Sequence, residues 1–271
     1  MEHQQHVDSE AEEKSAPSAH VVYEAIRIEG RHELERQSSS LAWSGLAAGL
    51  SMGFSFVTQA LLEHHLPDTP WRPLIASFGY SLGFLIVILG RQQLFTENTL
   101  TVILPLLHKQ EARDYYYVAR LWSVVLVANL VGTFLFAWAL AKTAVFDPDV
   151  HQAFAALAGR TGHHPFAVTL WRGIYAGWLI ALMVWLLPAA ESARIWIVSI
   201  ITYVVGLAHF PHIIAGATET FYLGLNGNRP WSEVLSGFIL PALIGNTIGG
   251  VTLVAALAHA QIVGDKKQSH G

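Results

Sequence analysis

Long apolar stretches without charge are the feature of this sequence that most constrains its fold. A helix rises ~1.5 Å per residue, so ~20 apolar residues are needed to cross the ~30 Å hydrocarbon core of a bilayer. The first stretch, residues 41–62, is long enough and contains no charged residue. Further apolar stretches lie at residues 74–107, 118–140, 166–187, 195–225 and 235–260. The sequence therefore predicts an all-α membrane protein with six transmembrane helices.

The amino-acid composition agrees with membrane insertion and excludes two other classes of protein. Hydrophobic residues make up 52% of the chain and charged residues only 13%, against about 25% charged in an average soluble domain. The formal net charge of −4 indicates no basic face, so we expect no nucleic-acid partner. Because the chain has no cysteine, it can form neither disulfides nor thiolate metal sites.

The distribution of lysine and arginine predicts which side of the membrane holds the termini. With six spans both termini lie on one side. Of the 16 basic residues, ten fall on that side or at the span ends next to it, five fall on or next to the other side, and Arg91 falls near the centre of a span. The positive-inside rule then places both termini in the cytoplasm. The predicted domains are a cytoplasmic tail at residues 1–38, a six-span transmembrane domain at residues 39–262 and a cytoplasmic tail at residues 263–271.

The N-terminal tail is polar and contains an acidic run at residues 8–13. It lacks an apolar segment behind a basic start, so we expect a retained tail and not a cleaved signal peptide. Residues 21–36 have the pattern of an amphipathic helix, in which Arg27, Arg31 and Arg36 are available to anionic lipid headgroups. The alternative is an ordinary solvated helix ahead of the first span.

The second and fifth apolar stretches are too long for one helix and carry polar residues near their centres. Residues 90–99 include Arg91 and Glu97, and a charge at the bilayer centre costs ~2.5–3.5 kcal/mol on insertion scales. Residues 206–219 include Pro211, which lacks a backbone donor and disfavours helical conformation in the preceding residue. We therefore expect both helices to break near the midplane. Since broken backbone at this depth must be buried in protein or line an aqueous cavity, the breaks mark a solute pathway.

Three motifs recur in the same order in the two halves of the chain, which predicts an internal repeat. The pairs are Gly45-x-x-x-Gly49 with Gly173-x-x-x-Gly177, Thr96-Glu97 with Thr218-Glu219, and Asn129-x-x-Gly132 with Asn246-x-x-Gly249. Their offsets are 128, 122 and 117 residues. We expect the glycines and asparagines in helix packing, because small residues let helix backbones approach closely. Three spans per half invert the second copy, as in channels and transporters with a midplane site.

Four short motifs follow one another along the predicted spans. They are Leu94-Phe95-Thr96, Asn129-Leu-Val-Gly132, Phe210-x-His212-x-Ile214-Ala215 and Gly245-Asn246-Thr-Ile-Gly249-Gly250. With them the sequence resembles the formate/nitrite transporter family over about residues 45–260. Arg91, Glu97 and Glu219 stand where this family has small or apolar residues, and Gly216 stands where it usually has Asn, which indicates a divergent branch.

The resemblance implies homopentamers of aquaporin-like protomers in a bacterial inner membrane, each with its own pore for a small monovalent anion or its conjugate acid. It implies no enzymatic activity, no cofactor and no resident metal. It further implies that the loop interrupting the second helix moves between gating positions, with Thr96 as its hydroxyl contact and His212 as the central pore histidine. His209 fits the family pattern less well and is a second candidate.

We interpret His212 as the residue that lets an anion cross without its charge. A neutral imidazole, with an ordinary pKa of ~6.5, can donate a proton to a weak-acid anion and avoid the cost of an ion in low dielectric. Leu94, Phe95 and Tyr80 are the expected apolar constrictions. The alternative is a structural histidine that a backbone carbonyl satisfies at the helix break.

The three charges inside the predicted spans have two interpretations. Arg91 with Glu97 or Glu219 would form a neutralised structural pair, which we favour because burying either charge alone is costly. Alternatively, Glu97 and Glu219 would ring the two mouths of the pore and oppose anions. A protonated acid, a neutral solute or a cation would then be preferred.

Other functions stay open from the residues alone. The same histidine would serve a proton-coupled carboxylate symporter, which the residues do not separate from a channel. A pore blocked by Arg91, Phe84 and Phe95 would indicate a structural or regulatory membrane protein. His209, His212 and Glu219 could suggest the metal site of an intramembrane enzyme, but the proline between the two histidines argues against a regular ligand face. Histidines also occur in Glu63-His64-His65 and His163-His164, which we place in solvated outer loops.

Overall fold

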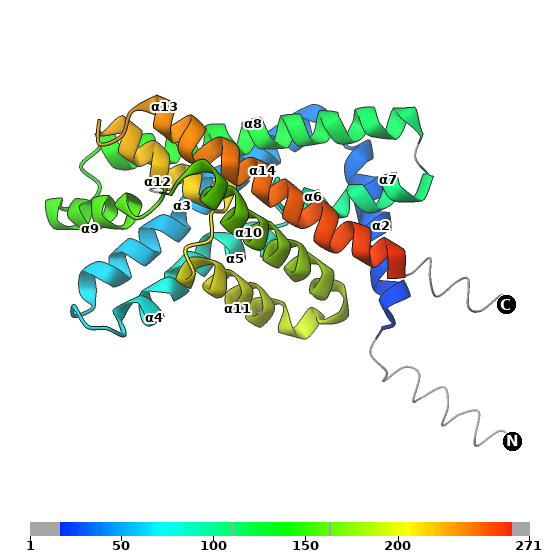
Figure 1. The fold of residues 1–271 in the computed structure, drawn as a ribbon, viewed down its shortest axis with the longest axis horizontal. Coiled ribbons are helices and arrows are strands. Elements are labelled where there is room, and N and C mark those ends of the chain that lie inside the picture. The colour runs from blue at the N-terminus through cyan, green and yellow to red at the C-terminus, as the bar shows by residue number, and fades with distance from the viewer. Residues whose placement is uncertain (1–16, 110, 163, 262–271) are drawn as a thin grey trace, which may run out of the picture.

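The computed structural model describes residues 17–109, 111–162 and 164–261, and this part of the chain forms helices and loops without a strand (Figure 1). The all-α class is therefore confirmed. By length and composition, five helices in these ranges are able to cross a membrane: Ser38–His65, Arg72–Leu89, Ala112–Lys142, Phe166–Ala189 and Trp231–Gln261. The fifth predicted stretch is instead divided into two short apolar helices. The acidic run at residues 8–13 and the tail at residues 263–271 lie outside the described residues.

The first half of the chain contains one interrupted helix between two long ones. Its elements are α2 (Ala19–Glu35), α3 (Ser38–His65), α4 (Arg72–Ala76), the 3-10 helix η1 (Ser77–Tyr80), α5 (Ser81–Leu89), α6 (Asn98–Thr101), α7 (Ile103–Lys109) and α8 (Ala112–Lys142). The segments α4, η1 and α5 follow one another directly and end at Leu89. Helix resumes only at Asn98, so the second apolar stretch is broken over the polar residues, as its sequence predicts.

The second half repeats this order of long and interrupted helices. Its elements are α9 (Pro148–Gly159), α10 (Phe166–Leu186), η2 (Leu187–Ala189), η3 (Glu191–Ala193), α11 (Arg194–Leu207), α12 (Ile213–Leu225), α13 (Trp231–Glu233), η4 (Val234–Ile239), α14 (Leu240–Ile248) and η5 (Gly249–Ala256). The segments η4 and η5 are π-helical turns within the last long helix. The predicted break around Pro211 separates α11 from α12.

Both interrupted helices end in the same backbone motif. Two N–H groups beyond each helix end donate back to carbonyls of the last turns: Gln92 N to Val87 O at 2.9 Å, Phe210 N to Val205 O at 3.0 Å, Arg91 N to Ile88 O at 3.3 Å and His209 N to Gly206 O at 3.1 Å. This is the Schellman termination, in which the residue after the helix is left-handed. Arg91 (φ 53°) and His209 (φ 50°) take that position, where glycine is usual and another residue costs about 1–2 kcal/mol.

Close contacts between helix backbones join α3 to α8 and α10 to α14. A Cβ atom on Gly49 would lie 2.2 Å from Asn129 O, and one on Gly177 would lie 2.2 Å from Asn246 O. Any side chain at either glycine would therefore force the paired helices apart. The other glycines of the repeated motifs line the same two interfaces: Gly45, Gly132, Gly173 and Gly249.

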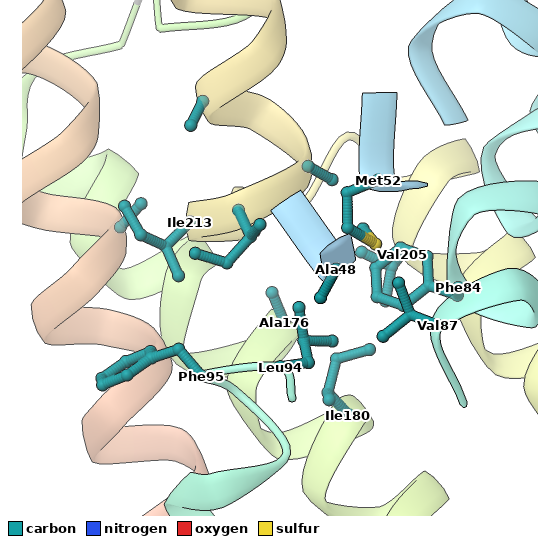
Figure 2. Packing of buried hydrophobic residues seen from close by; sticks show 14 of the residues in the cluster. Ala48, Met52, Phe84, Val87, Leu94, Phe95, Ala176, Ile180, Val205 and Ile213 are labelled. Atoms are coloured by element: carbon teal, nitrogen blue, oxygen red, sulfur yellow. The ribbon is translucent and has the colours of Figure 1, made fainter. Parts of the chain in front are cut away.

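Apolar side chains from both halves fill the centre of the molecule. Leu94, from the first break, is completely buried. Figure 2 shows it near side chains of α3, α5, α10 and α11, among them Ala48, Val87, Ala176, Ile180 and Val205. Phe95 is also buried and points to the opposite side of the chain from Leu94 (Figure 2). The first break is therefore enclosed by protein, as interrupted backbone inside a membrane requires.

The helix α2 falls within the predicted N-terminal tail and packs against the protein. Its buried residues are Val22, Tyr23, Ile26, Gly30 and Leu34, and it contacts α6, α7 and α8. Arg27 pairs with Glu24 at 2.7 Å, and Arg36, the residue that caps the end of α2, pairs with Glu33 at 2.9 Å. The apolar side of this amphipathic helix is thus covered by the bundle.

Candidate functional site

Asn129 of α8 holds the first break in place. Its side-chain Nδ2 donates to Gly45 O at 2.7 Å and to Gln93 O at 2.9 Å, and its Oδ1 accepts from Phe95 N at 2.9 Å. The side chain has no exposed surface. One buried amide therefore satisfies three backbone groups, two of them from the interrupted segment, which has no helical partners of its own.

Asn246 of α14 does the same for the second break. Its Nδ2 donates to Gly173 O at 2.9 Å and to Pro211 O at 2.8 Å, and its Oδ1 accepts from Ile213 N at 2.8 Å. This side chain is also fully buried. Each break is thus fastened to a long helix by the same three bonds.

The two sets of contacts give the register between the halves of the chain. Gln93 and Phe95 correspond to Pro211 and Ile213, an offset of 118 residues, and the Schellman residues Arg91 and His209 have the same offset. The sequence pairing of Thr96-Glu97 with Thr218-Glu219, at an offset of 122, is therefore four residues out of register. The Thr-Glu dipeptide recurs one helical turn beyond the structurally equivalent position, so the match in sequence does not mark equivalent residues.

Thr96 and His212 meet at the centre of the molecule, one from each break. The Thr96 Oγ1 atom lies 2.8 Å from His212 Nε2, and both side chains are buried. His212 is also the N-cap of α12, where its Nδ1 accepts the Ala215 backbone N–H at 3.2 Å. Since Nδ1 accepts a hydrogen bond, the ring proton is on Nε2, and the neutral imidazole donates to the Thr96 hydroxyl oxygen.

One hydrogen-bond donor of the Thr96–His212 pair, the Thr96 hydroxyl, is left for a solute. The Thr96 hydroxyl accepts from His212, and its own proton has no acceptor among the described residues. The backbone carbonyl of Thr96 accepts the Thr99 hydroxyl at 2.7 Å, which holds the start of α6 against it. The Phe84 ring lies edge-on to the imidazole, with ring centroids 4.9 Å apart. The arrangement presents one polarised hydroxyl in apolar surroundings.

Most of the predicted site residues of the second half gather around a cavity of about 40 Å³ next to α9, which we call the α9-side cavity. It is lined by Tyr80, Arg160, His209, His212 and Glu219, among others. Arg172 donates to Ala208 O at 2.8 Å and to His209 O at 3.3 Å, which supports the strained turn. His209 therefore faces the approach to the Thr96–His212 pair.

A polar network that sequence reasoning missed borders the α9-side cavity, which its members Arg160, Thr161 and Glu219 line. Arg160 makes two hydrogen bonds to Glu63, at 2.8 and 2.9 Å, and Thr161 donates to the buried Glu219 carboxylate. Arg229 donates to Thr161 O at 2.6 Å. Glu63 was placed in a solvated loop, but it lies in α3 and is 7% exposed. The signal in the sequence was the helical periodicity of α3, which places Glu63 on the same buried side of the helix as Gln59 and Ala60.

A second cavity of about 50 Å³, the α2-side cavity, lies at the other break. Glu29 and Glu33 of α2 line it together with Arg91, Gln93 and Glu97. Arg91 Nη1 bonds Glu29 at 2.8 Å, and Gln93 Nε2 donates to Glu33 at 2.8 Å. In Figure 1, α2 and α9 lie toward opposite ends of the molecule, so Glu97 and Glu219 belong to different ends.

The predicted pairing of Arg91 with Glu97 or Glu219 is wrong. Arg91 is 68% exposed and pairs with Glu29, because the Schellman turn carries it out of the helix and α2 supplies a carboxylate there. The Glu97 carboxylate has no ion-pair partner within the described ranges. Gln93 lines the α2-side cavity, and Thr96 lies three residues further along the chain. The two residues between them, Leu94 and Phe95, are buried and apolar, so they lie between that cavity and the central hydroxyl.

The described residues contain no group of three or more histidines and carboxylates close enough to hold a metal ion. His209 and His212 are thus not joined by Glu219 in such a group. His163 lies outside the described residues.

Comparison with known proteins gives a consistent set of matches. The profile described as "Formate/nitrite transporter" matches residues 20–260. The chain is 40% identical to "Inner membrane protein YfdC" of Escherichia coli K12, over 94% of this chain and 83% of that protein. It is 27% identical to a "Probable formate transporter" of Methanothermobacter thermautotrophicus, over 66% and 71% of the two chains. A solved "Pentameric formate channel with formate bound" has the same fold, with a TM-score of 0.71, 18% identity and coverage of 83% and 98%.

Proposed function

This chain belongs to the formate/nitrite transporter family, whose members are transporters and channels and not enzymes, and from that premise we propose that each protomer conducts a small weak acid. The solute would be of the size of formate or nitrite, and it would cross in its protonated, uncharged form. The observation that carries this proposal is the Thr96–His212 pair, a single polarised hydroxyl enclosed by apolar side chains.

The role proposed for the pair follows from its hydrogen bonds. His212 donates its only ring proton to Thr96 Oγ1, so the Thr96 hydroxyl proton points away from the ring toward a solute oxygen. A hydroxyl in low dielectric holds a polar solute there at less cost than bare apolar walls. His212 then orients and polarises the donor. This refines the interpretation of His212 as a proton donor, because a neutral imidazole that gave up Nε2–H would be left as an anion.

Charge at both ends of the pathway supports passage of the uncharged acid. Carboxylates line the α2-side cavity, at Glu29, Glu33 and Glu97, and the α9-side cavity contains Glu219. The cations that line the two cavities, Arg91 and Arg160, are already paired with Glu29 and Glu63, and Arg172 and Arg229, next to the α9-side cavity, donate to backbone carbonyls. Carboxylates at the entrances repel an anion and leave a neutral acid unaffected. We infer that protonation from water precedes entry.

The architecture proposed for the membrane is two inverted repeats of three spans, with α5–α6 and α11–α12 as the interrupted members. It is supported by the equal bonds of Asn129 and Asn246 and by the two Schellman turns. Both termini would be cytoplasmic, by the distribution of basic residues, and the membrane would be an inner membrane, as in the name of the Escherichia coli relative.

A pentamer is proposed by likeness to the pentameric formate channel. Apolar side chains on α3 and α8 remain exposed in the single chain, among them Trp43 (73%), Val127 (60%) and Val131 (45%). They line an open groove of about 550 Å³. Neighbouring protomers and lipid are the apolar environments that would cover it.

The second candidate function is a proton-coupled carboxylate symporter. The same buried hydroxyl and histidine favour it, because alternating exposure of Thr96 and His212 would couple one proton to one carboxylate. Flux of formate, nitrite, acetate, hydrosulfide and neutral solutes into proteoliposomes, measured across pH, tests both. Flux linear in the concentration of the neutral acid supports a channel, whereas saturation with a fixed proton stoichiometry supports the symporter. Absence of flux for every solute would contradict both.

A further inference from the structure

A cavity of about 320 Å³ lies between α2, α7 and α8 and shares no lining residue with the two pore cavities. Its cationic lining consists of Arg27, Arg31, Arg113 and Arg120, with His108 and Tyr117 beside them. Two carboxylates line it as well, Glu35 and Asp114, so positive charge is in excess. In Figure 1, α2 and α7 lie at the end of the molecule opposite α9.

Two of these arginines, Arg27 and Arg120, are held by short bonds to the protein, and the other two, Arg31 and Arg113, are not. Arg27 is held by Glu24 at 2.7 Å, and Arg120 donates to Leu34 O and Arg36 O, at 2.8 and 2.9 Å. Arg31 reaches a carboxylate only at 4.0 Å, in an exposed pair with Glu35. Arg113 makes no ion pair within the described ranges. The cavity therefore holds guanidinium groups whose donors remain for a ligand.

The position of these groups is set by an aromatic ring. The guanidinium of Arg113 lies 5.9 Å from the centroid of the Tyr117 ring, and that of Arg120 lies 5.3 Å from it. Stacking on a tyrosine lowers the conformational freedom of arginine without using its N–H donors. Arg113, which keeps its donors for a ligand, is thus ordered before the ligand arrives.

We propose that this cavity binds a phosphate group. Several arginines around one space match the charge and oxygen spacing of phosphate, and basic pockets between helices at the membrane surface bind phospholipid headgroups. The phosphate could be carried by an anionic lipid or by a soluble compound, and the chemistry recognised is the same. The inference is independent of what the pore conducts.

The test uses the purified full-length protein and a double variant, Arg31→Gln with Arg113→Gln, in which neutral amides replace two positive charges. Both side chains are exposed, and Arg31 is paired only at 4.0 Å with Glu35, so the fold should be preserved. The probes are phosphatidylglycerol, phosphatidylcholine and inorganic pyrophosphate, with bound lipid counted by native mass spectrometry and pyrophosphate affinity measured by calorimetry. The matched control is Arg194→Gln, since Arg194 does not line the cavity.

Loss of two arginines should weaken binding about tenfold or more. If phosphatidylglycerol binding falls and phosphatidylcholine binding does not, the source is a lipid headgroup; if pyrophosphate binding falls, the source is soluble phosphate. Either result supports the site, provided that Arg194→Gln binds like the wild type. Equal binding by the double variant and the wild type, or no binding of either probe by the wild type, would overturn it. If the double variant elutes from gel filtration at a different volume from the wild type, its fold or assembly has changed. The single variant Arg113→Gln then replaces it in the binding measurements, with the same criteria.

Discussion

The Thr96 hydroxyl and the His212 imidazole lie 2.8 Å apart, although 116 positions separate them in the chain. Each residue belongs to one of the two interrupted helices, and each break is fastened to a long helix by a buried asparagine. The site is therefore assembled from both halves of the protein. Its geometry depends on two backbone interruptions that a continuous helix could not provide.

Removal of the Thr96 hydroxyl should abolish most solute flux. Thr96→Val keeps the shape of the side chain and removes the hydroxyl donor that we propose faces the solute, so we expect a loss of formate flux of at least tenfold. Thr96→Ser retains the hydroxyl and should keep most of the flux. Formate-driven swelling of proteoliposomes measures both variants. A Thr96→Val protein that conducts like Thr96→Ser would show that the hydroxyl takes no part.

Neutralising the carboxylates at the pore ends should admit anions. In Glu97→Gln no ion pair is lost, because the carboxylate has none within the described ranges, and removal of the negative charge should raise formate flux at pH 8 several-fold. Glu219→Gln should act in the same direction and keep an acceptor for Thr161.

The control for this pair is Glu111→Gln, which changes an exposed carboxylate that lines neither pore cavity. Oligomer size on gel filtration should be the same for all three variants. Flux at pH 8 that stays at the wild-type level in both pore variants would contradict the proposed role of the carboxylates.

Asn129 and Asn246 should be equally important for stability. Replacement of either by Leu leaves two buried backbone groups of the break without a partner, which costs at least about 2 kcal/mol, or a fall in apparent Tm of roughly 4 °C or more. The comparison is Asn226→Leu, where an exposed side chain loses one bond to Tyr222 O. Thermal unfolding of the detergent-solubilised protein gives the three values. Similar Tm values for Asn226→Leu and the other two variants would refute the proposed fastening role.

The left-handed turn at His209 should tolerate glycine and reject a β-branched residue. At φ 50° His209→Gly removes a conformational cost of about 1–2 kcal/mol, partly offset by the greater freedom of glycine in the unfolded chain. His209→Val should lower the apparent Tm. Thermal unfolding in detergent distinguishes them, and a higher Tm for valine than for glycine would be inconsistent with the observed backbone.

The apolar stretches, the two breaks and the residues at the centre could be predicted from the sequence, because they depend on local composition. The polar residues after Leu89 and the proline at position 211 both disfavour a continuous membrane-spanning helix. The spacing of the family-like motifs points to Thr96 and His212. The partner of Arg91 could not be predicted. It depends on α2, which precedes the first span and docks beside the break to supply Glu29.

The polar network beside the α9-side cavity could not be predicted from the sequence for a related reason. Glu63 and Arg160 are 97 positions apart and meet only because α9 returns to the end of α3. The repeat register also needed the structure, since short motifs slide by a helical turn without losing their resemblance. The backbone bonds of Asn129 and Asn246 fix it at 118.

The most direct test of the central claim is formate flux, across pH, in proteoliposomes that contain His212→Gln or His212→Phe. If His212 orients and polarises Thr96 as a neutral donor, the glutamine amide can replace it and should keep a substantial part of the wild-type flux and its pH dependence. Phenylalanine should abolish flux in an oligomer of unchanged size. Wild-type flux and pH dependence in His212→Phe, or equal loss in both variants, would contradict the account.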